Sequence, residues 1–242
     1  MQIESIALKL RPRTVWEGCD LGVRLLQSWF GPVFRCHLAV ALPCLILCLA
    51  SGALAAWLPA LLIWLAKPWL DRTTLFVLSR ALFGGSTGVR EVWAARREVW
   101  LAGLARTLTL QRLSASRAFL QPVLQLEGLS GSALRSRLRQ LAGGRRGVAR
   151  AAGLAFASAE LAIVLSLLAL TLWLAPRSVR LEWNPFDALP GSRLDFLISL
   201  AYGAAVAFLE PFYVAAGFGM YVNRRVALEA WDIEQEFRRA FA

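Results

Sequence analysis

A long run without charge dominates the first third of this chain. From His37 to Ala66, thirty consecutive residues include no Asp, Glu, Lys or Arg. One helix of that length would be about 45 Å long, which exceeds the ~30 Å hydrocarbon core of a bilayer. Ser51 and Gly52 interrupt the run. It therefore predicts two membrane-spanning helices, over about Phe30–Ala50 and about Ala53–Leu70.

Four residues in this region carry further expectations. Arg35 and His37 are expected at the membrane interface, because they stand at the edge of the apolar run. Pro43 and Pro59 are expected to kink the two helices.

Composition and two later apolar runs extend this prediction to the whole chain. Hydrophobic residues make up 57% of the sequence and the mean hydropathy is +0.53, more apolar surface than one small soluble core would hide. Ala151–Ala175 and Phe196–Val222 are each long enough to span a bilayer. We expect an all-α integral membrane protein with four spans and amphipathic interfacial helices. Six spans are the alternative, with Leu75–Phe83 and Val99–Leu110 entering the membrane, although Arg80 and Arg106 make both poor spans.

The distribution of basic residues predicts the orientation. Residues 67–150 contain fifteen Lys or Arg and four acids, whereas residues 176–195 contain three of each. Positively charged loops tend to stay in the cytoplasm, so we expect both termini on the cytoplasmic side of the membrane. The expected segments are a cytoplasmic N-terminal helix (1–36), a transmembrane hairpin (37–70), basic interfacial helices (71–150), two spans with an external connector (151–222) and a cytoplasmic C-terminal helix (223–242).

Two stretches in the basic middle resemble surface helices. In VREVWAARREVWLAGLARTL (residues 89–108), Val92 and Val99 repeat at a spacing of seven, as do Trp93 and Trp100, among several arginines. Such a helix suits the surface of an anionic leaflet, and packing against the spans with a solvated basic face is the alternative. SALRSRLRQL (residues 132–141) is a second such helix, with Ser130 or Ser132 as its expected N-cap.

Two carboxyl groups are predicted deep in the bilayer. Glu160 lies about 15 Å along its helix from Arg150, and Glu210 lies about 21 Å before Arg224. Ionisable groups there face the bundle interior, are protonated or have a partner. One interpretation is a proton or cation site of a transporter. The favoured one is structural, with both carboxyls hydrogen-bonded to a neighbouring helix and Pro211 freeing a backbone carbonyl.

Several classes of chemistry lack their residues. His37 is the only histidine, so histidine-rich metal sites are excluded, and the four cysteines are interpreted as small hydrophobic residues. FGGSTGVRE (residues 83–91) lacks the Gly-Lys-Ser/Thr ending of a phosphate-binding loop. The net charge of +11 is concentrated beside predicted spans, which favours membrane topology over nucleic-acid binding. We therefore expect no metal, no cofactor, no nucleic acid and no enzymatic activity; an intramembrane enzyme could draw only on Cys36 and His37.

The two ends of the chain carry a family resemblance. MYVNRRVALEAWDIEQEF (residues 220–237) and LRPRTVWEGCDLGVRLLQSWF (residues 10–30) resemble bacterial membrane proteins related to the membrane domain of glycerophosphodiester phosphodiesterases. LIWLAKPWLDRTTLFVLSRALFG (residues 62–84) and LQLEGLSG (residues 124–131) are similar to a proteobacterial branch of that group. The chain lacks the phosphodiesterase domain, so the resemblance implies no such activity. It implies other membrane proteins as partners, in an assembly linked to a MoxR-type ATPase.

The C-terminal segment supplies candidate contact residues. Arg224 and Arg225 stand where the last span leaves the membrane, able to meet lipid phosphates or the negative end of a helix. Glu229, Asp232 and Glu234 follow on a cytoplasmic extension that we expect to pair with LRSRLRQL or with the N-terminal helix; a solvated helix is the alternative.

These features together predict a function. The first expectation is a non-enzymatic accessory or structural subunit of a membrane complex. The alternative is a small transporter or lipid-handling protein that uses Glu210 and Glu160 as its titrating site.

Overall fold

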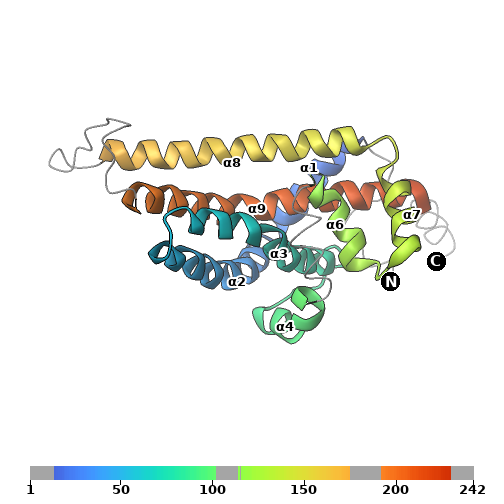
Figure 1. Ribbon diagram of the computed structural model, residues 1–242. Coiled ribbons are helices and arrows are strands. Elements are labelled where there is room, and N and C mark those ends of the chain that lie inside the picture. Colours follow the sequence, from blue (N-terminus) through green and yellow to red (C-terminus); the bar gives the residue numbers. More distant parts are fainter. Residues whose placement is uncertain (1–13, 102–113, 115, 175–191, 230–242) are drawn as a thin grey trace.

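The computed structural model describes residues 14–101, 114, 116–174 and 192–229, and every regular element in that part of the chain is helical (Figure 1). This confirms the all-α class. Three helices are long and apolar enough to cross a membrane: Phe30–Ala53, Arg146–Thr171 and Leu194–Glu229. They overlap the first, third and fourth of the predicted spans. The second predicted span, about Ala53–Leu70, is not among them, since the helix there extends over Leu58–Ala81 and includes several charged residues.

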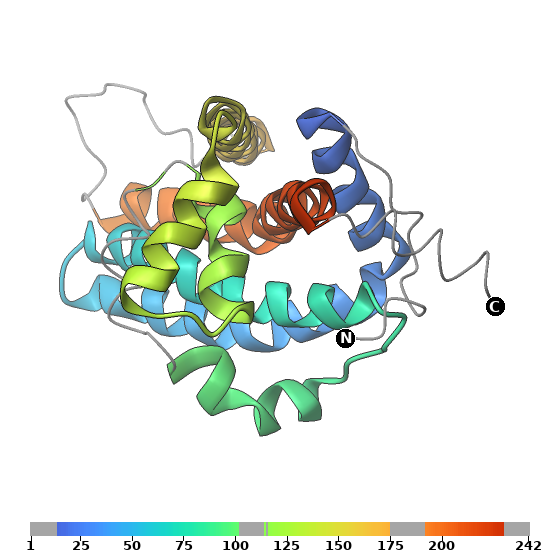
Figure 2. The ribbon, with the colours of Figure 1, turned by 90° about the vertical axis from the view of Figure 1, so that its right-hand side faces the viewer.

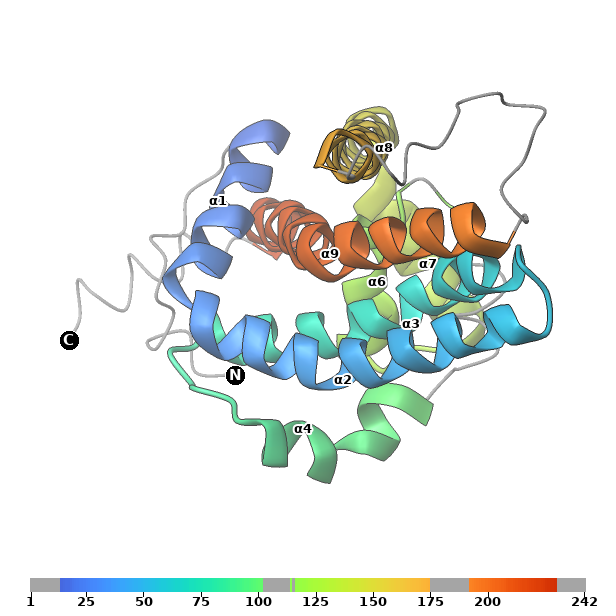
Figure 3. The ribbon, with the colours of Figure 1, turned by 90° about the vertical axis from the view of Figure 1, so that its left-hand side faces the viewer.

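The charge-free run forms a hairpin, as its length required. Helix α2 occupies Phe30–Ala50, a short 3₁₀ turn follows at Ser51–Ala53, and α3 runs antiparallel to α2 over Leu58–Ala81 (Figure 3). Pro59 lies in the first turn of α3, where a missing N–H costs no hydrogen bond, so the expected kink there is wrong. Pro43 does lie inside α2.

The second half of α3 forms the centre of the bundle. From Lys67 to Leu78 only Trp69 escapes full burial, because α2, α6, α9 and the α4 region surround this stretch. The long helix α9, Ser192–Glu229, packs against α2, α3, α6 and α8. Helix α8, Arg146–Leu174, lies antiparallel along α9 at the edge of the molecule (Figure 1).

A close backbone contact holds the N-terminal helix. Helix α1, Val15–Ser28, begins at a capping box in which Thr14 and Glu17 bond to each other's backbone, and it crosses the second half of α9 (Figure 3). A Cβ added to Gly219 of α9 would lie 2.2 Å from the Gly18 carbonyl oxygen and 2.6 Å from the Gly22 nitrogen of α1. Only glycine permits two helices to approach this closely.

The basic middle is broken into short pieces rather than one long surface helix. Helix α4 occupies Val89–Ala94 and has Ala95 as its C-cap residue. A π-helical turn, Arg97–Leu101 (η3), follows it. The two tryptophans that repeat at a spacing of seven lie together, with ring centres 5.4 Å apart, although Trp93 is 61% exposed and Trp100 is buried. Helices α6 (Arg117–Leu126) and α7 (Gly131–Ala142) lie at the end of the bundle where α9 ends (Figure 2). Ser130 is the N-cap residue of α7, although its side chain makes no capping bond.

Candidate functional site: a buried ion cluster

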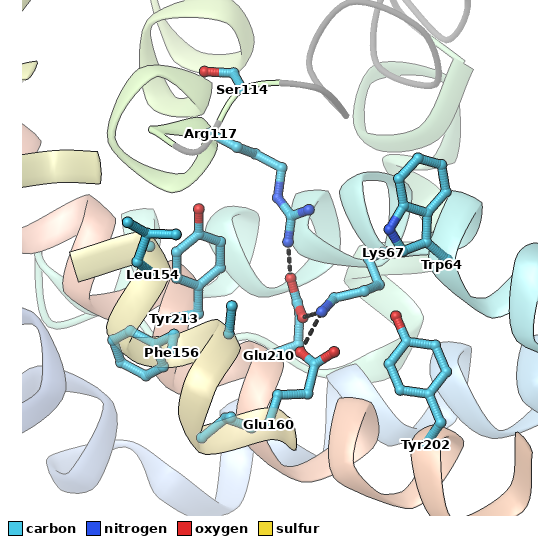
Figure 4. A pocket seen from close by; sticks show the side chains of 13 residues that line it. Trp64, Lys67, Ser114, Arg117, Leu154, Phe156, Glu160, Tyr202, Glu210 and Tyr213 are labelled. Atoms are coloured by element: carbon cyan, nitrogen blue, oxygen red, sulfur yellow. Dashed lines mark hydrogen bonds and ion pairs between the residues drawn. The ribbon is translucent and has the colours of Figure 1, made fainter. Parts of the chain in front are cut away.

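Glu210 and Glu160 belong to one cluster of charged side chains. Lys67 and Asp71 lie one turn apart on α3, and Arg117 begins α6. Glu160 is midway along α8 and Glu210 midway along α9; all of these except Asp71 are drawn in Figure 4. Four helices that are distant in sequence therefore each contribute to the same site.

The contacts join all five side chains in one chain of ion pairs. Lys67 Nζ lies 2.9 Å from a Glu210 carboxyl oxygen and also contacts Glu160. Arg117 contacts the other oxygen of Glu210, and its Nε lies 2.9 Å from Asp71 Oδ2. Glu210 thus lies between the two cations, as Figure 4 shows.

Burial is deep and uneven across the cluster. The side chains of Asp71 and Glu210 are 0% and 2% exposed, whereas that of Glu160 is 16% exposed. Taking ions out of water costs several kcal/mol each, and ion pairing offsets this only when charges match. Burial alone would lower the pKa of Arg117, but Asp71 and Glu210 hold that pKa above its ordinary value, so the guanidinium stays charged.

The charges in the cluster do not balance. Among the residues that the structure describes, three carboxyl groups face two cations, so this cluster is neutral only when one carboxyl carries a proton. Such closely spaced groups share protons as a unit rather than titrating one by one. No group of His, Cys, Asp and Glu within the described residues is arranged to hold a metal ion.

A cavity of about 350 Å³ opens beside the cluster. Its lining includes four charged side chains of the cluster: Lys67, Arg117, Glu160 and Glu210. Helix α8 forms one wall through residues between Gly153 and Glu160. Aromatic rings complete its lining, and two of them face the cations: Lys67 Nζ is 5.9 Å from the ring centre of Tyr202, and Arg117 Cζ is 5.0 Å from that of Tyr213. Both contacts have the geometry of cation–π interactions.

The structure corrects the expected place of His37. Its side chain is 1% exposed and its Nδ1 lies 3.0 Å from Thr74 Oγ1 on α3, so it is inside the bundle rather than at the interface. The neighbouring Thr73 accepts a hydrogen bond of 2.9 Å from Trp100 Nε1. Buried polar side chains of α3 therefore continue past Asp71 to Thr73 and Thr74.

Pro211 lies inside α9 directly after Glu210, and the helix continues through it. Because a proline lacks an N–H, one backbone carbonyl of the preceding turn loses its usual partner at the level of the cluster.

The C-terminal candidates lie in a second polar group, outside the ion cluster. Arg224 Nη2 donates a 3.2 Å hydrogen bond to the Gln140 carbonyl in the last turn of α7, the negative end of that helix. Arg225 forms an ion pair of 2.6 Å with Glu229. Asp232 and Glu234 lie outside the described residues.

Glu229 also contacts Arg137 of α7, one of the two helices to which we expected this extension to bind. Arg137 in turn pairs with Glu127 at 2.8 Å. The hydrogen bond to Glu127, together with that to Glu229, holds the pKa of Arg137 above its ordinary value despite partial burial. This group joins the ends of α6, α7 and α9.

Three residues of the cluster were missed from the sequence: Lys67, Asp71 and Arg117. The expected second span ended near Leu70, so these charges were assigned to the interface or the basic middle. One signal was present, because Lys67 and Asp71 stand four residues apart and therefore share a helix face.

Comparison of the chain with protein-family models, curated proteins and solved structures finds no match. The geometry of the ion cluster is therefore the strongest indication of function.

Proposed function

We propose that the chain crosses a bacterial inner membrane four times, through α2, α3, α8 and α9, with both termini in the cytoplasm. Helix α3 lacks the composition of a span because of Lys67, Asp71 and Arg72, yet all three side chains are buried inside the bundle and meet no lipid. The excess of Lys and Arg in residues 67–150 supports the orientation.

Thiol labelling in intact cells tests this topology. In a variant without the four native cysteines, Leu54→Cys at the exposed tip of the α2–α3 hairpin should react with a membrane-impermeant reagent added outside. Ser136→Cys on α7 is the matched control and should react only after the cells are permeabilised. Protection of Leu54→Cys in intact cells would contradict a hairpin that crosses the membrane.

We further propose that the protein is a small proton-linked transporter, with the ion cluster as its titrating site. The observation that carries this proposal is the excess of carboxyl groups: among the described residues, three acids share two cations inside a membrane bundle, beside a cavity. A purely structural network gains nothing from an unbalanced charge, whereas a site that binds and releases one proton requires it.

Glu160 is the carboxyl through which we expect the cluster to exchange its shared proton with the cavity. It is the most exposed carboxyl of the cluster and lines the cavity, and it is the only charged residue of α8 after Arg150. Its ion pair with Lys67 joins α8 to α3. When the cluster takes up a proton, the attraction of Lys67 for the carboxylates weakens, and α8 is held less tightly over the cavity. The cavity then opens on one side when the proton binds and closes when it leaves.

Infrared difference spectroscopy of the reconstituted protein tests this site. Lowering the pH from mildly alkaline to mildly acidic should produce the carbonyl band of one protonated buried carboxyl. Glu160→Gln should remove the titrating band. Glu91→Gln, which removes an exposed carboxylate paired with Arg80, should leave it unchanged. A protein whose spectrum shows no titrating buried carboxyl would overturn the proposal.

A non-enzymatic subunit of a membrane complex is the second candidate. In α8 only 6% of the apolar stretch is buried, against 50% in α9, so one whole face of a spanning helix is open to lipid or to another membrane protein. The resemblance to proteins found with membrane partners supports the same proposal. The infrared titration separates the two, since a cluster that only holds helices together exchanges no proton.

A further inference from the structure

An apolar groove of about 730 Å³ lies between α2, α3 and the α4–η3 segment. Pro43 and Leu47 of α2 form one side, and Leu62 and Trp69 of α3 form the other. Residues from α4 and η3 close one end of it. None of the residues that line it is charged, and its volume is in the ~300–1,000 Å³ range of ligand pockets.

Tryptophan rings form the closed end. Trp69 and Trp100 lie with ring centres 5.7 Å apart, and Trp100 and Trp93 lie edge to face at 5.4 Å. Trp93 is 61% exposed although its ring belongs to this cluster. Tryptophans gather where hydrocarbon meets lipid headgroups.

Arginines stand beside these rings. Arg90, Arg96 and Arg97 are all exposed, and Arg96 Nη1 donates to the Trp93 carbonyl at 3.3 Å, which places the Arg96 side chain next to the groove. Of the two acids in the segment, Glu91 is paired with Arg80. The α4–η3 segment, which lines one side of the groove, thus has three exposed arginines and two exposed acids, Glu91 and Glu98, and its net charge is positive.

We propose that this groove binds an anionic phospholipid, with one acyl chain between α2 and α3 and the phosphate at Arg96 and Arg97. The apolar walls match the chain, and the arginines of the α4–η3 segment match the headgroup. Helix α2, which forms one wall of the groove, is itself a candidate span. The inference is independent of the proton site, because none of the five cluster residues lines this groove.

Native mass spectrometry of the delipidated full chain tests the assignment, with phosphatidylglycerol and phosphatidylcholine of identical chains as probes. One phosphatidylglycerol should bind preferentially. Combining Arg96→Gln with Arg97→Gln should weaken its binding by about thirty-fold, the effect expected for two basic groups at an anionic lipid surface.

Two further variants make the result decisive. Arg135→Gln with Arg139→Gln removes the same charge from the exposed face of α7 and should leave binding unchanged. Ala39→Trp fills the groove from its exposed edge and should weaken binding of both lipids. Equal retention of the two lipids, an equal loss in the α7 variant, or a second protein chain held in the groove instead of lipid would overturn the proposal.

Discussion

Replacing Lys67 by methionine should destabilise the protein by about 3–5 kcal/mol, the usual cost of removing one partner of a buried ion pair. Lys67 contacts both Glu160 and Glu210, so its loss leaves three carboxyls with Arg117 as the only cation of the cluster. The expected result is a large drop in thermal stability in mild detergent. Adding Glu160→Gln to Lys67→Met should recover part of the loss, because it removes one of the uncompensated charges.

Arg80, another residue of α3, forms an exposed ion pair and provides the control. Arg80 pairs with Glu91 at 2.9 Å, and both side chains are about half exposed. Exposed pairs contribute less than ~1 kcal/mol, so Arg80→Met should change stability little. Similar losses in Lys67→Met and Arg80→Met would show that the cluster does not hold α3 and α8 together.

Two of the described helices follow the apolar runs of the sequence closely, whereas α3, predicted over about Ala53–Leu70, occupies Leu58–Ala81. The structure places α2 at Phe30–Ala50, the range predicted, because the charge-free run and the Ser51-Gly52 break constrain both ends. Helix α8 likewise begins at Arg146, five residues before its expected start at Ala151. A bilayer requires about twenty apolar residues per span, so hydropathy alone is informative for such helices.

The residues of the ion cluster could not all be predicted from the sequence in this way. Glu160 and Glu210 were recognised because they interrupt apolar runs, but Lys67 and Asp71 follow an apolar run and look like its polar end. Arg117 is one of many arginines in the basic middle, and nothing local distinguishes it. Only tertiary packing turns it inward, because α6 places its first residue against α3 and α9.

His37 is a residue whose position the sequence predicted wrongly. A lone histidine at the end of an apolar run is reasonably assigned to the interface. The structure instead buries it against Thr74, since the bundle continues past the apolar run and α3 carries polar residues into the interior. Composition indicates where lipid contact ends, but it does not show where the protein core ends.

The contact between α1 and α9 leads to the second large effect. Gly219→Ala should destabilise the protein by about 3 kcal/mol and release α1, because the new methyl group would lie 2.2 Å from the Gly18 carbonyl oxygen. That oxygen is backbone, so no side-chain rotation relieves the clash.

Gly203→Ala is the matched control on the same helix: its methyl group would lie 3.5 Å from Leu45 and 3.6 Å from Ile63, in ordinary contact. Thermal unfolding and protease cleavage within α1 measure both changes. Equal stability of the two variants would mean that α1 tolerates a wider separation from α9 than the structure shows.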